Sequence, residues 1–198
     1  MTEQERQERV AKGQLWLDTE EFIAHQGKMK DLMYEFNMSR PSETARRAEL
    51  MKQIFGTVGK DVWINQPLSL LVGTTVTIGD GTYANAGLTL IDDASITIGK
   101  GCLFGTNVTL CTTGHPIDPE ERAKCSMYSF PITIGDGAWL GAGSIVLPGI
   151  TIGKFADWRR KRGDKSHSRL YGRSRQSLPP HSQNQRTRQG ILLAGQKV

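Results

Sequence analysis

The strongest constraint on the fold of this chain is an isoleucine-glycine pair that returns four times between residues 78 and 153. Around these pairs, aliphatic residues recur six positions apart. The residues at this spacing are Val72, Ile78, Ala84 and Leu90, then Ile98, Phe104 and Leu110, and then Ile134, Leu140, Val146 and Ile152. A period of six fits neither a strand nor a helix. It predicts hexapeptides that each form a short flat strand and a turn, three of them making one triangular rung of a parallel β-helix.

Two irregularities interrupt this period. Twenty residues separate Ile78 from Ile98, which is three hexapeptides plus two, so we expect a small bulge between Leu90 and Ile96. Thirty-six residues separate Ile98 from Ile134, and residues 114–131 within this interval have no aliphatic spacing. We expect residues 114–131 to form a loop pushed out of a coil that spans residues 59–154. Long loops inside compact domains are usually functional, so the chemistry is sought here.

Residues 1–58 differ in composition from the repeat region, since they are rich in charged residues and Met and lack the hexapeptide spacing. We expect short amphipathic helices at residues 3–12, 18–26, 30–36 and 42–55. The first rung of a solenoid exposes unpaired strand backbone and apolar side chains, so we expect a cover on physical grounds. The sequence therefore predicts an N-terminal α-helical cap on a mainly β fold.

Composition favours one domain with appendages. In 198 residues with 37% apolar content, no apolar run approaches a membrane span, and the N-terminus is charged, unlike a signal peptide. We therefore expect a cytoplasmic protein without a membrane partner. Cys102, Cys111 and Cys125 form an odd set without CxxC spacing, which supports neither a disulfide framework nor a zinc site.

The positive charge of the chain is concentrated at its C-terminal end. Residues 155–198 hold eleven Lys and Arg against two Asp and Glu, whereas the rest holds fourteen against eighteen. Taken literally, this non-repeat stretch is a disordered segment or a nucleic-acid-binding arm. However, the repeat stops in the middle of a rung, and a reading frame shifted by one nucleotide can continue the coil as PIGAGSVVTKAIPDYTVAVGNPCR. We interpret residues 155–198 as frameshift-derived, so we do not expect a nucleic-acid partner.

Several motifs together resemble the maltose and galactoside O-acetyltransferases, which are hexapeptide-repeat acyltransferases. The resemblance covers about residues 10–154. The motifs are the repeat itself, Leu32-Met33-Tyr34-Glu35-Phe36-Asn37, Tyr83-Ala84-Asn85, Asp92-Asp93, Thr113-Gly114-His115-Pro116 and Met127-Tyr128-Ser129-Phe130-Pro131-Ile132. The resemblance implies a left-handed β-helix, a homotrimer, and transfer of acetyl from acetyl-CoA to a sugar hydroxyl.

His115 is the residue that the resemblance implies as the catalytic base. A sugar hydroxyl is a poor nucleophile, so a positioned base must remove its proton during attack on the thioester, and histidine suits this role near neutral pH. Of the other histidines, His25 lies in the expected cap, while His167 and His181 lie in the tail. A loop histidine without a role is the ordinary interpretation, and the match to the family's catalytic histidine reverses it.

Acceptor binding requires hydrogen-bond donors and acceptors for several hydroxyl groups. The resemblance implies this role for Asn85 and Asp93, with Tyr83 and Met127 lining the pocket. Asp18 is matched to an N-terminal aspartate of the family without a supporting motif. Leu71 stands where the galactoside enzymes have a serine, which weakens galactoside as the acceptor. Without the resemblance, Asn85 and Asp93 would be turn and corner residues.

On the cofactor side, the resemblance places Trp139 beside the pantetheine arm of CoA. The main-chain amides near Gly141 and Ala142 could bind that arm or the acyl carbonyl and stabilise a developing oxyanion. The ordinary interpretation of Trp139 is a corner aromatic packed against a neighbouring chain. Further CoA contacts of the family fall in residues 155–198, which puts the cofactor affinity of this chain in doubt.

Three alternatives stay open. A metal enzyme of the γ-carbonic anhydrase kind shares the coil, but it needs three histidines around zinc, and only His115 is near the coil, so no metal is expected. A nonenzymatic scaffold with a nucleic-acid-binding tail is the second. An acetyltransferase acting on an antibiotic hydroxyl is the third, although the cap and Met127-Tyr128-Ser129-Phe130-Pro131 favour a sugar.

Overall fold

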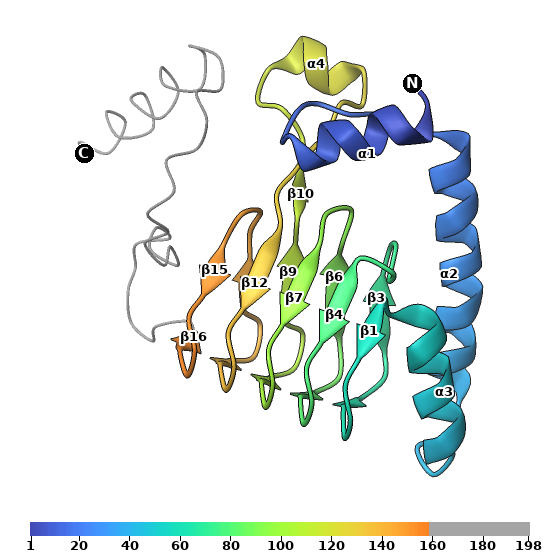
Figure 1. Cartoon of the computed structure of the whole chain (residues 1–198), viewed down its shortest axis with the longest axis vertical. Coiled ribbons are helices and arrows are strands. Elements are labelled where there is room, and N and C mark those ends of the chain that lie inside the picture. Colours follow the sequence, from blue (N-terminus) through green and yellow to red (C-terminus); the bar gives the residue numbers. More distant parts are fainter. Residues whose placement is uncertain (159–198) are drawn as a thin grey trace, which may run out of the picture.

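The structure, a computed structural model, describes residues 1–158. Three helices, α1 (Glu3–Ala11), α2 (Glu20–Met38) and α3 (Thr44–Ile54), precede a coil of short strands, and α4 (Pro119–Ala123) lies in a hairpin that projects from the coil (Figure 1). Residues 159–198 lie outside the described part, as does most of the tail that we interpret as frameshift-derived.

The strands form three parallel sheets that are the faces of the coil. The first sheet contains β1 (Thr57–Val58), β4 (Val76–Ile78), β7 (Ile96–Ile98), β12 (Ile132–Ile134) and β15 (Thr151–Ile152). The second contains β2 (Trp63–Ile64), β5 (Tyr83–Ala84), β8 (Leu103–Phe104), β13 (Trp139–Leu140) and β16 (Asp157–Trp158). The third contains β3 (Leu68–Leu70), β6 (Leu88–Ile91), β9 (Thr109–Cys111) and β14 (Ile145–Val146). Each strand pairs with the equivalent strand one rung away, which confirms the predicted hexapeptide β-helix.

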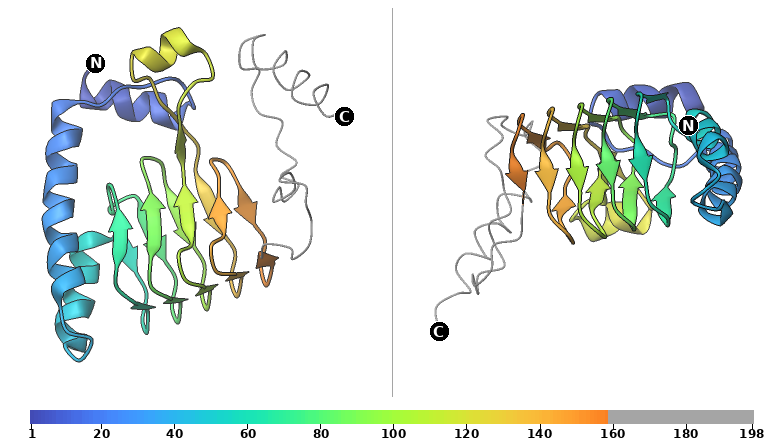
Figure 2. Two further views of the ribbon diagram at one scale, coloured as in Figure 1. Left: turned by 180° about the vertical axis from the view of Figure 1, so that it is seen from behind. Right: turned by 90° about the horizontal axis from the view of Figure 1, so that it is seen from below.

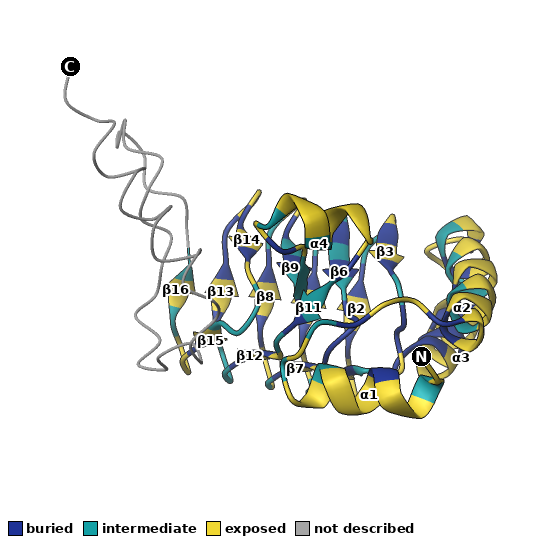
Figure 3. Cartoon of the chain, turned by 90° about the horizontal axis from the view of Figure 1, so that it is seen from above, coloured by how far each residue is buried: buried dark blue, intermediate teal, exposed yellow. Residues whose placement is uncertain are grey.

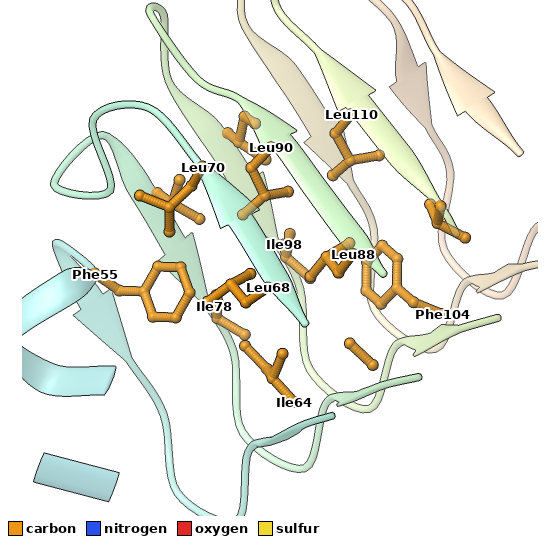
Figure 4. Packing of buried hydrophobic residues seen from close by; sticks show 14 of the residues in the cluster. Phe55, Ile64, Leu68, Leu70, Ile78, Leu88, Leu90, Ile98, Phe104 and Leu110 are labelled. Carbon is orange, nitrogen blue, oxygen red and sulfur yellow. The ribbon is translucent and has the colours of Figure 1, made fainter. Parts of the chain in front are cut away.

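The interior of the coil is built from columns of aliphatic side chains (Figure 4). Ile78 pairs with Ile98, and Leu90 pairs with both Leu70 and Leu110, so each side chain stacks on its counterpart in the next rung. All five are at most 2% exposed. Because burial of such a side chain stabilises a fold by about 1.5 to 3 kcal/mol, the columns are the main source of the coil's stability.

The bulge expected between Leu90 and Ile96 lies at a corner of the second rung. The first rung has the same two-residue insertion at its corresponding corner. The chain advances twenty residues between Thr57 and Thr77, which are paired, but eighteen between Thr133 and Thr151. The two extra residues change which side chain points inward before Ile78. Our assignment of Val72 to the column is wrong, because Leu70 occupies that position, and Val72 packs in a separate cluster with Trp16 and Phe22.

The second helix corrects another expectation. We predicted separate helices at residues 18–26 and 30–36, but α2 runs unbroken through Gly27. A helical glycine costs about 1 kcal/mol relative to alanine, and burial of Phe22, Met29 and Phe36 on one face of α2 outweighs this cost. Within residues 1–158, no helix combines the length and the apolar character needed to cross a bilayer.

Helices α2 and α3 cover the open first rung, as Figure 2 shows from two further directions. The side-chain amide of Asn37 donates to the Leu68 carbonyl and accepts from the Leu68 N–H, both at 2.8 Å, and so replaces a missing neighbour strand. The Arg47 guanidinium donates to the Ile64 carbonyl at 2.6 Å. The cap therefore satisfies backbone groups that a bare solenoid end would leave unpaired.

At the other end, the coil continues four residues beyond the boundary expected at residue 154. Asp157 pairs with Trp139, and Trp158 pairs with Leu140. Parallel pairing uses main-chain groups, so it does not require the hexapeptide side chains. Just before this strand, Phe155 adopts a φ of 55° and is 80% exposed, at a turn position where other rungs have Gly81, Gly101 and Gly137.

Candidate active site

The extruded segment is an ordered hairpin. Strands β10 (Thr113–Gly114) and β11 (Tyr128–Ser129) pair antiparallel, with Thr113 opposite Ser129. Between them, the Asp118 carboxylate caps α4 by accepting from the amides of Glu120 and Glu121. The hairpin and α1 lie at the same edge of the coil, and α4 is exposed (Figures 1 and 3).

His115 follows β10 directly, and its imidazole is exposed in the single chain. Its Nδ1 lies 3.0 Å from the main-chain carbonyl oxygen of Ser126 on the opposite arm of the hairpin. A carbonyl oxygen only accepts hydrogen bonds, so Nδ1 carries the proton in the neutral ring. Nε2 is then left with a free lone pair, which is the state that a general base requires.

Asp92 and Asp93 occupy the corner between β6 and β7, and both are buried. The Asp92 carboxylate accepts hydrogen bonds from the amides of Leu71, Val72 and Gly73 at 2.6–3.0 Å. It thereby fixes the turn of the preceding rung. Asp93 accepts a hydrogen bond from the Thr113 hydroxyl, which connects this corner to the start of the hairpin.

The pKa of Asp93 is raised above its ordinary value. Burial is the main cause, and the hydrogen bond from Thr113 opposes it. The negative charges of Asp92 and Asp18 raise this pKa further, while Arg6 lowers it. Asp18 and Asp93 are therefore within electrostatic reach of each other, as the interpretation of both as acceptor-site residues requires. Asp18 itself is exposed.

The segment before Asp18 is joined to the hairpin. Trp16 and Met127 exchange two main-chain hydrogen bonds of 2.9 Å. The Trp16 side chain packs with Phe22 and Val72, and both Leu71 and Met127 lie against this cluster. The site thus has an apolar wall beside its carboxylates. No sequence motif indicated Trp16; the short apolar run Leu15-Trp16-Leu17 between polar residues was the available signal.

Tyr83 and Asn85 lie at another corner of the coil. Tyr83 projects outward from β5 and is 38% exposed, and its hydroxyl accepts from the Asn65 side-chain amide at 2.8 Å. The Asn85 side-chain oxygen accepts from the Ala86 amide at 2.8 Å, which leaves the Asn85 NH2 group available within the described structure. The four residues of β6 separate this corner from Asp93, a span of roughly 13 Å.

The three residues expected to contact CoA lie around β13. Trp139 projects outward from β13 and is 43% exposed. The Gly141 N–H donates to the Trp158 carbonyl at 2.8 Å, so this amide belongs to the coil ladder. The Ala142 N–H has no hydrogen-bond partner within residues 1–158, and Ala142 is exposed. Of the two amides, Ala142 is therefore the one free to bind a ligand.

One exposed ladder connects these positions. On the second sheet, Trp63, Tyr83, Leu103 and Trp139 occupy equivalent positions in successive rungs, and each is at least 36% exposed. Outward residues of the first sheet are threonines at the same positions of all its strands. The apolar ladder is thus specific to the sheet that carries Tyr83 and Trp139.

No group of three His, Cys, Asp or Glu side chains within residues 1–158 is arranged to hold a metal ion. The described histidines are His25 and His115, and the His25 Nε2 lies 3.0 Å from the Val72 carbonyl oxygen in the cap. The arrangement therefore offers an imidazole base, buried and exposed carboxylates, and a free main-chain amide as its chemical groups.

Comparison with known proteins agrees with the fold of the described residues. The maltose acetyltransferase hexapeptide capping motif matches residues 9–59, and the hexapeptide repeat of succinyl-transferase matches residues 95–117 and 131–156. These matches correspond to the helical cap and the coil. They define the class of protein as a hexapeptide-repeat acyltransferase.

Relatives sharpen this class. A galactoside O-acetyltransferase of Escherichia coli (strain K12) is 45% identical over 147 residues, which are 74% of this chain and 72% of that protein. A solved galactoside acetyltransferase in complex with coenzyme A is 42% identical with a TM-score of 0.72, covering 76% of this chain and 78% of the other. A maltose O-acetyltransferase structure from Clostridium difficile 630 is 32% identical with a TM-score of 0.73, covering 75% and 80%. This chain belongs to the maltose and galactoside O-acetyltransferase family, and its homologues are acetyl-CoA-dependent O-acetyltransferases.

Proposed function

We propose that this chain transfers the acetyl group of acetyl-CoA to a hydroxyl group of a sugar, with His115 as the general base. The observation that carries the proposal is the 3.0 Å contact between His115 Nδ1 and the Ser126 carbonyl oxygen. It orients the ring and makes Nε2 the unprotonated nitrogen of the neutral imidazole. This chain also belongs to an acetyltransferase family. Few other groups are needed for this reaction.

In the proposed reaction, the sugar oxygen forms a bond to the thioester carbonyl carbon while Nε2 of His115 takes the hydroxyl proton. Collapse of the tetrahedral intermediate breaks the carbon–sulfur bond. The imidazolium then returns the proton to the departing sulfur. The products are an acetylated sugar and CoA as a free thiol, and His115 regains its neutral state.

The acceptor would be held by polar groups on an apolar wall. Asp93 and Asp18 accept hydrogen bonds from sugar hydroxyls, while the Asn85 NH2 group and the Tyr83 hydroxyl can donate. Met127, together with Leu71, offers an apolar surface to the C–H face of the ring. Leu71 cannot hydrogen bond a sugar through its side chain, so we do not assign galactoside as the acceptor.

The acetyl donor would lie along the second sheet. Trp139 offers an exposed flat surface to the pantetheine arm, and the Ala142 N–H can bind the thioester oxygen. One such donor is often worth about 3 to 4 kcal/mol in the transition state. The Gly141 N–H is already bound to the Trp158 carbonyl, so it would not bind the ligand. It would help only by holding the neighbouring Ala142 in place.

We infer a homotrimer, because one chain does not bring these groups together. Tyr83 and Asn85 lie at one corner, Asp93 and the His115 hairpin at another, and β6 separates them. A neighbouring copy that packs on the apolar ladder of the second sheet would supply the missing half and bury Trp63 and Leu103. With three copies around an axis, the second sheet of each copy packs against a neighbour in the same way. Sedimentation equilibrium tests this inference, and a monomer at enzyme concentrations would contradict it.

We also propose that residues from about 155 onward are the product of a shifted reading frame and not part of the naturally selected protein. Phe155 supports this proposal, because a bulky residue stands in a left-handed turn position that Gly81, Gly101 and Gly137 occupy in three other rungs and the smaller Asp61 occupies in the first. Sequencing the encoding DNA tests it. A gene whose reading frame gives this tail without interruption, and whose relatives share the tail, would contradict it.

The test of activity is release of the CoA thiol from acetyl-CoA with a panel of sugars, for this chain and for a version with the reading frame restored. His115→Ala should lower kcat by about 10²- to 10⁴-fold, because general-base catalysis is lost. His25→Gln is the matched control, since it removes a histidine from the cap and should keep the activity. Full activity of His115→Ala would contradict the assignment of the base, and a panel without any acetylated sugar would contradict the acceptor class.

A further inference from the structure

Three hydrogen bonds join the N-terminal segment to the buried acid at the corner of the coil. The Trp16 Nε1 lies 3.1 Å from the Ser129 hydroxyl oxygen, which lies 2.7 Å from the Thr113 hydroxyl oxygen. The Thr113 hydroxyl in turn donates to Asp93 Oδ2. We call this series, Trp16, Ser129, Thr113 and Asp93, the Trp16–Asp93 chain. Trp16, Ser129 and Asp93 are buried.

The hydrogen bonds of the Trp16–Asp93 chain can point in one direction only, from the indole to the carboxylate. An indole nitrogen only donates and a carboxylate only accepts, while each hydroxyl has a single proton. Thr113 uses its proton on Asp93, so its oxygen accepts from Ser129. Ser129 has then used its own proton and accepts from Trp16. Every donor in the series is occupied, and the series ends on the carboxylate.

The main chain of Trp16 is linked to the part of the site that contains His115. Trp16 and Met127 exchange two hydrogen bonds of 2.9 Å. Met127 directly follows Ser126, whose carbonyl oxygen holds the Nδ1 of His115. The residue whose indole supports Asp93 therefore also fixes the strand segment that orients the imidazole.

The Trp16 ring is held from its other side. Phe22 packs edge-on against it at a centroid distance of 5.8 Å, and the Arg6 guanidinium lies 5.3 Å from the Trp16 ring and 3.7 Å from the Phe22 ring. Glu3 binds Arg6 with a closest contact of 2.7 Å. Trp16 is 1% exposed, so its indole has little freedom to leave the chain.

We propose that Trp16 is a positioning residue that sets the acceptor-binding carboxylate of Asp93 relative to His115 through the Trp16–Asp93 chain. The proposal rests on the proposed function, because it concerns the same site. A buried carboxylate that must accept from a sugar hydroxyl needs one oxygen fixed and the other free. The Trp16–Asp93 chain fixes Oδ2 of Asp93, and Oδ1 of Asp93 remains for the ligand.

The test is steady-state kinetics with acceptor and acetyl-CoA varied in turn, using a sugar that the panel shows to be acetylated. Trp16→Phe keeps an aromatic ring and the main-chain pairing but removes the indole donor, and it should raise the acceptor KM about three- to tenfold. Thr113→Val removes the bond to the carboxylate and should raise it about ten- to a hundredfold. The KM for acetyl-CoA should stay within twofold in both variants.

Two controls separate positioning from packing. Thr113→Ser keeps the hydroxyl and should restore most of the acceptor affinity lost in Thr113→Val. Val10, in α1, is partly buried against the same apolar cluster. Val10→Ala disturbs this packing but keeps the Trp16–Asp93 chain and the Phe22 and Arg6 contacts of the indole, and it should leave the acceptor KM close to that of the wild type. Because the bonds act in series, Trp16→Phe should add no further loss to Thr113→Val in the double variant.

Equal effects of Trp16→Phe and Val10→Ala on the acceptor KM, or additive effects in the double variant, would overturn the proposal. A second measurement works without turnover: the indole N–H signal of Trp16 in NMR spectra should move when Thr113 is replaced by Val, and a signal that stays fixed would also overturn it. If the wild type acetylates no sugar, the proposed function fails by itself, and the indole signal still decides whether the Trp16–Asp93 chain exists.

Discussion

The coil and the junction between the N-terminal segment and the hairpin are stabilised in different ways. In the coil, the same kind of contact recurs in every rung, with an aliphatic side chain on its counterpart and main-chain pairing between neighbours. At the junction, contacts occur once each: the Asp92 turn, the Trp16–Met127 pairing and the chain that ends on Asp93. Repetition gives the coil its stability, and the unrepeated contacts place the chemical groups.

The largest effect is expected inside the coil. Phe104→Ala should lower the free energy of unfolding by about 3 to 5 kcal/mol, because the side chain is 2% exposed and its removal leaves a cavity between Ala84 and Leu140. Thr97→Ala, an exposed outward position of β7 on the first sheet, is the control and should change it by less than about 0.5 kcal/mol. Denaturant unfolding measures both. Similar losses in the two variants would show that the inward column does not carry the stability.

The next effect concerns the turn held by Asp92. Asp92→Asn keeps the shape but replaces one acceptor oxygen with an NH2 group, which leaves a buried main-chain amide without a partner. We expect a loss of about 1 to 3 kcal/mol in the free energy of unfolding. Asp61→Asn is the control, since Asp61 is an exposed residue with a φ of 55°, a conformation that asparagine adopts readily. Equal stability of both variants would mean that the corner is not a buried polar anchor.

A smaller, pH-dependent effect is expected at α1. The hydrogen bond from Arg6 is the main cause that lowers the pKa of Glu3 from 4.5 to about 2. A depressed pKa in the folded state stabilises the fold above pH 4.5, and this contribution is lost as the pH falls from 4.5 towards 2. Glu3→Gln should therefore destabilise the docking of α1 by about 1 to 2 kcal/mol at pH 7, and the difference should shrink across that window.

Hydrogen exchange of the α1 amides measures this docking, because α1 can open without unfolding of the coil. Glu8→Gln is the control, since the Glu8 carboxylate makes only exposed contacts, with Lys12 at 3.4 Å and with the Gln4 side-chain amide at 3.5 Å. A difference between Glu3→Gln and wild type that is the same at pH 2 and pH 7 would contradict the role of the ionised carboxylate.

The smallest effect is expected on the outside of the coil. Lys100 binds Asp80 of the preceding rung at 3.0 Å, and Lys154 binds Asp136 at 2.9 Å, so an alternating ladder of charges follows one corner. All four side chains are well exposed, and exposed ion pairs contribute little and are screened by salt. Lys100→Ala should leave the unfolding midpoint unchanged in high salt. A clear loss there would show that this repeated polar contact matters as much as the buried columns.

The period of six was sufficient to predict the coil, because every inward position repeats and a shift of register would expose a whole column. It failed locally at Val72, where two inserted residues moved the inward position to Leu70. It also did not predict that α2 would run through Gly27, since burial of Phe22, Met29 and Phe36 depends on the surface of the first rung. Motifs named His115, Asp93 and Asn85, and these remain predictions as site residues.

What the sequence determined by itself was the β-helix, its helical cap, the loop outside the coil and the family, since all depend on spacing and short motifs along the chain. What only the tertiary structure decided was the use of the Gly141 amide in the coil, the lack of a partner for the Ala142 amide within residues 1–158, and the series of bonds from Trp16 to Asp93. These are pairings between residues up to 113 positions apart, as for Trp16 and Ser129. Each hydrogen bond requires one donor and one acceptor at a fixed distance and angle, and a one-dimensional pattern does not specify which distant groups meet.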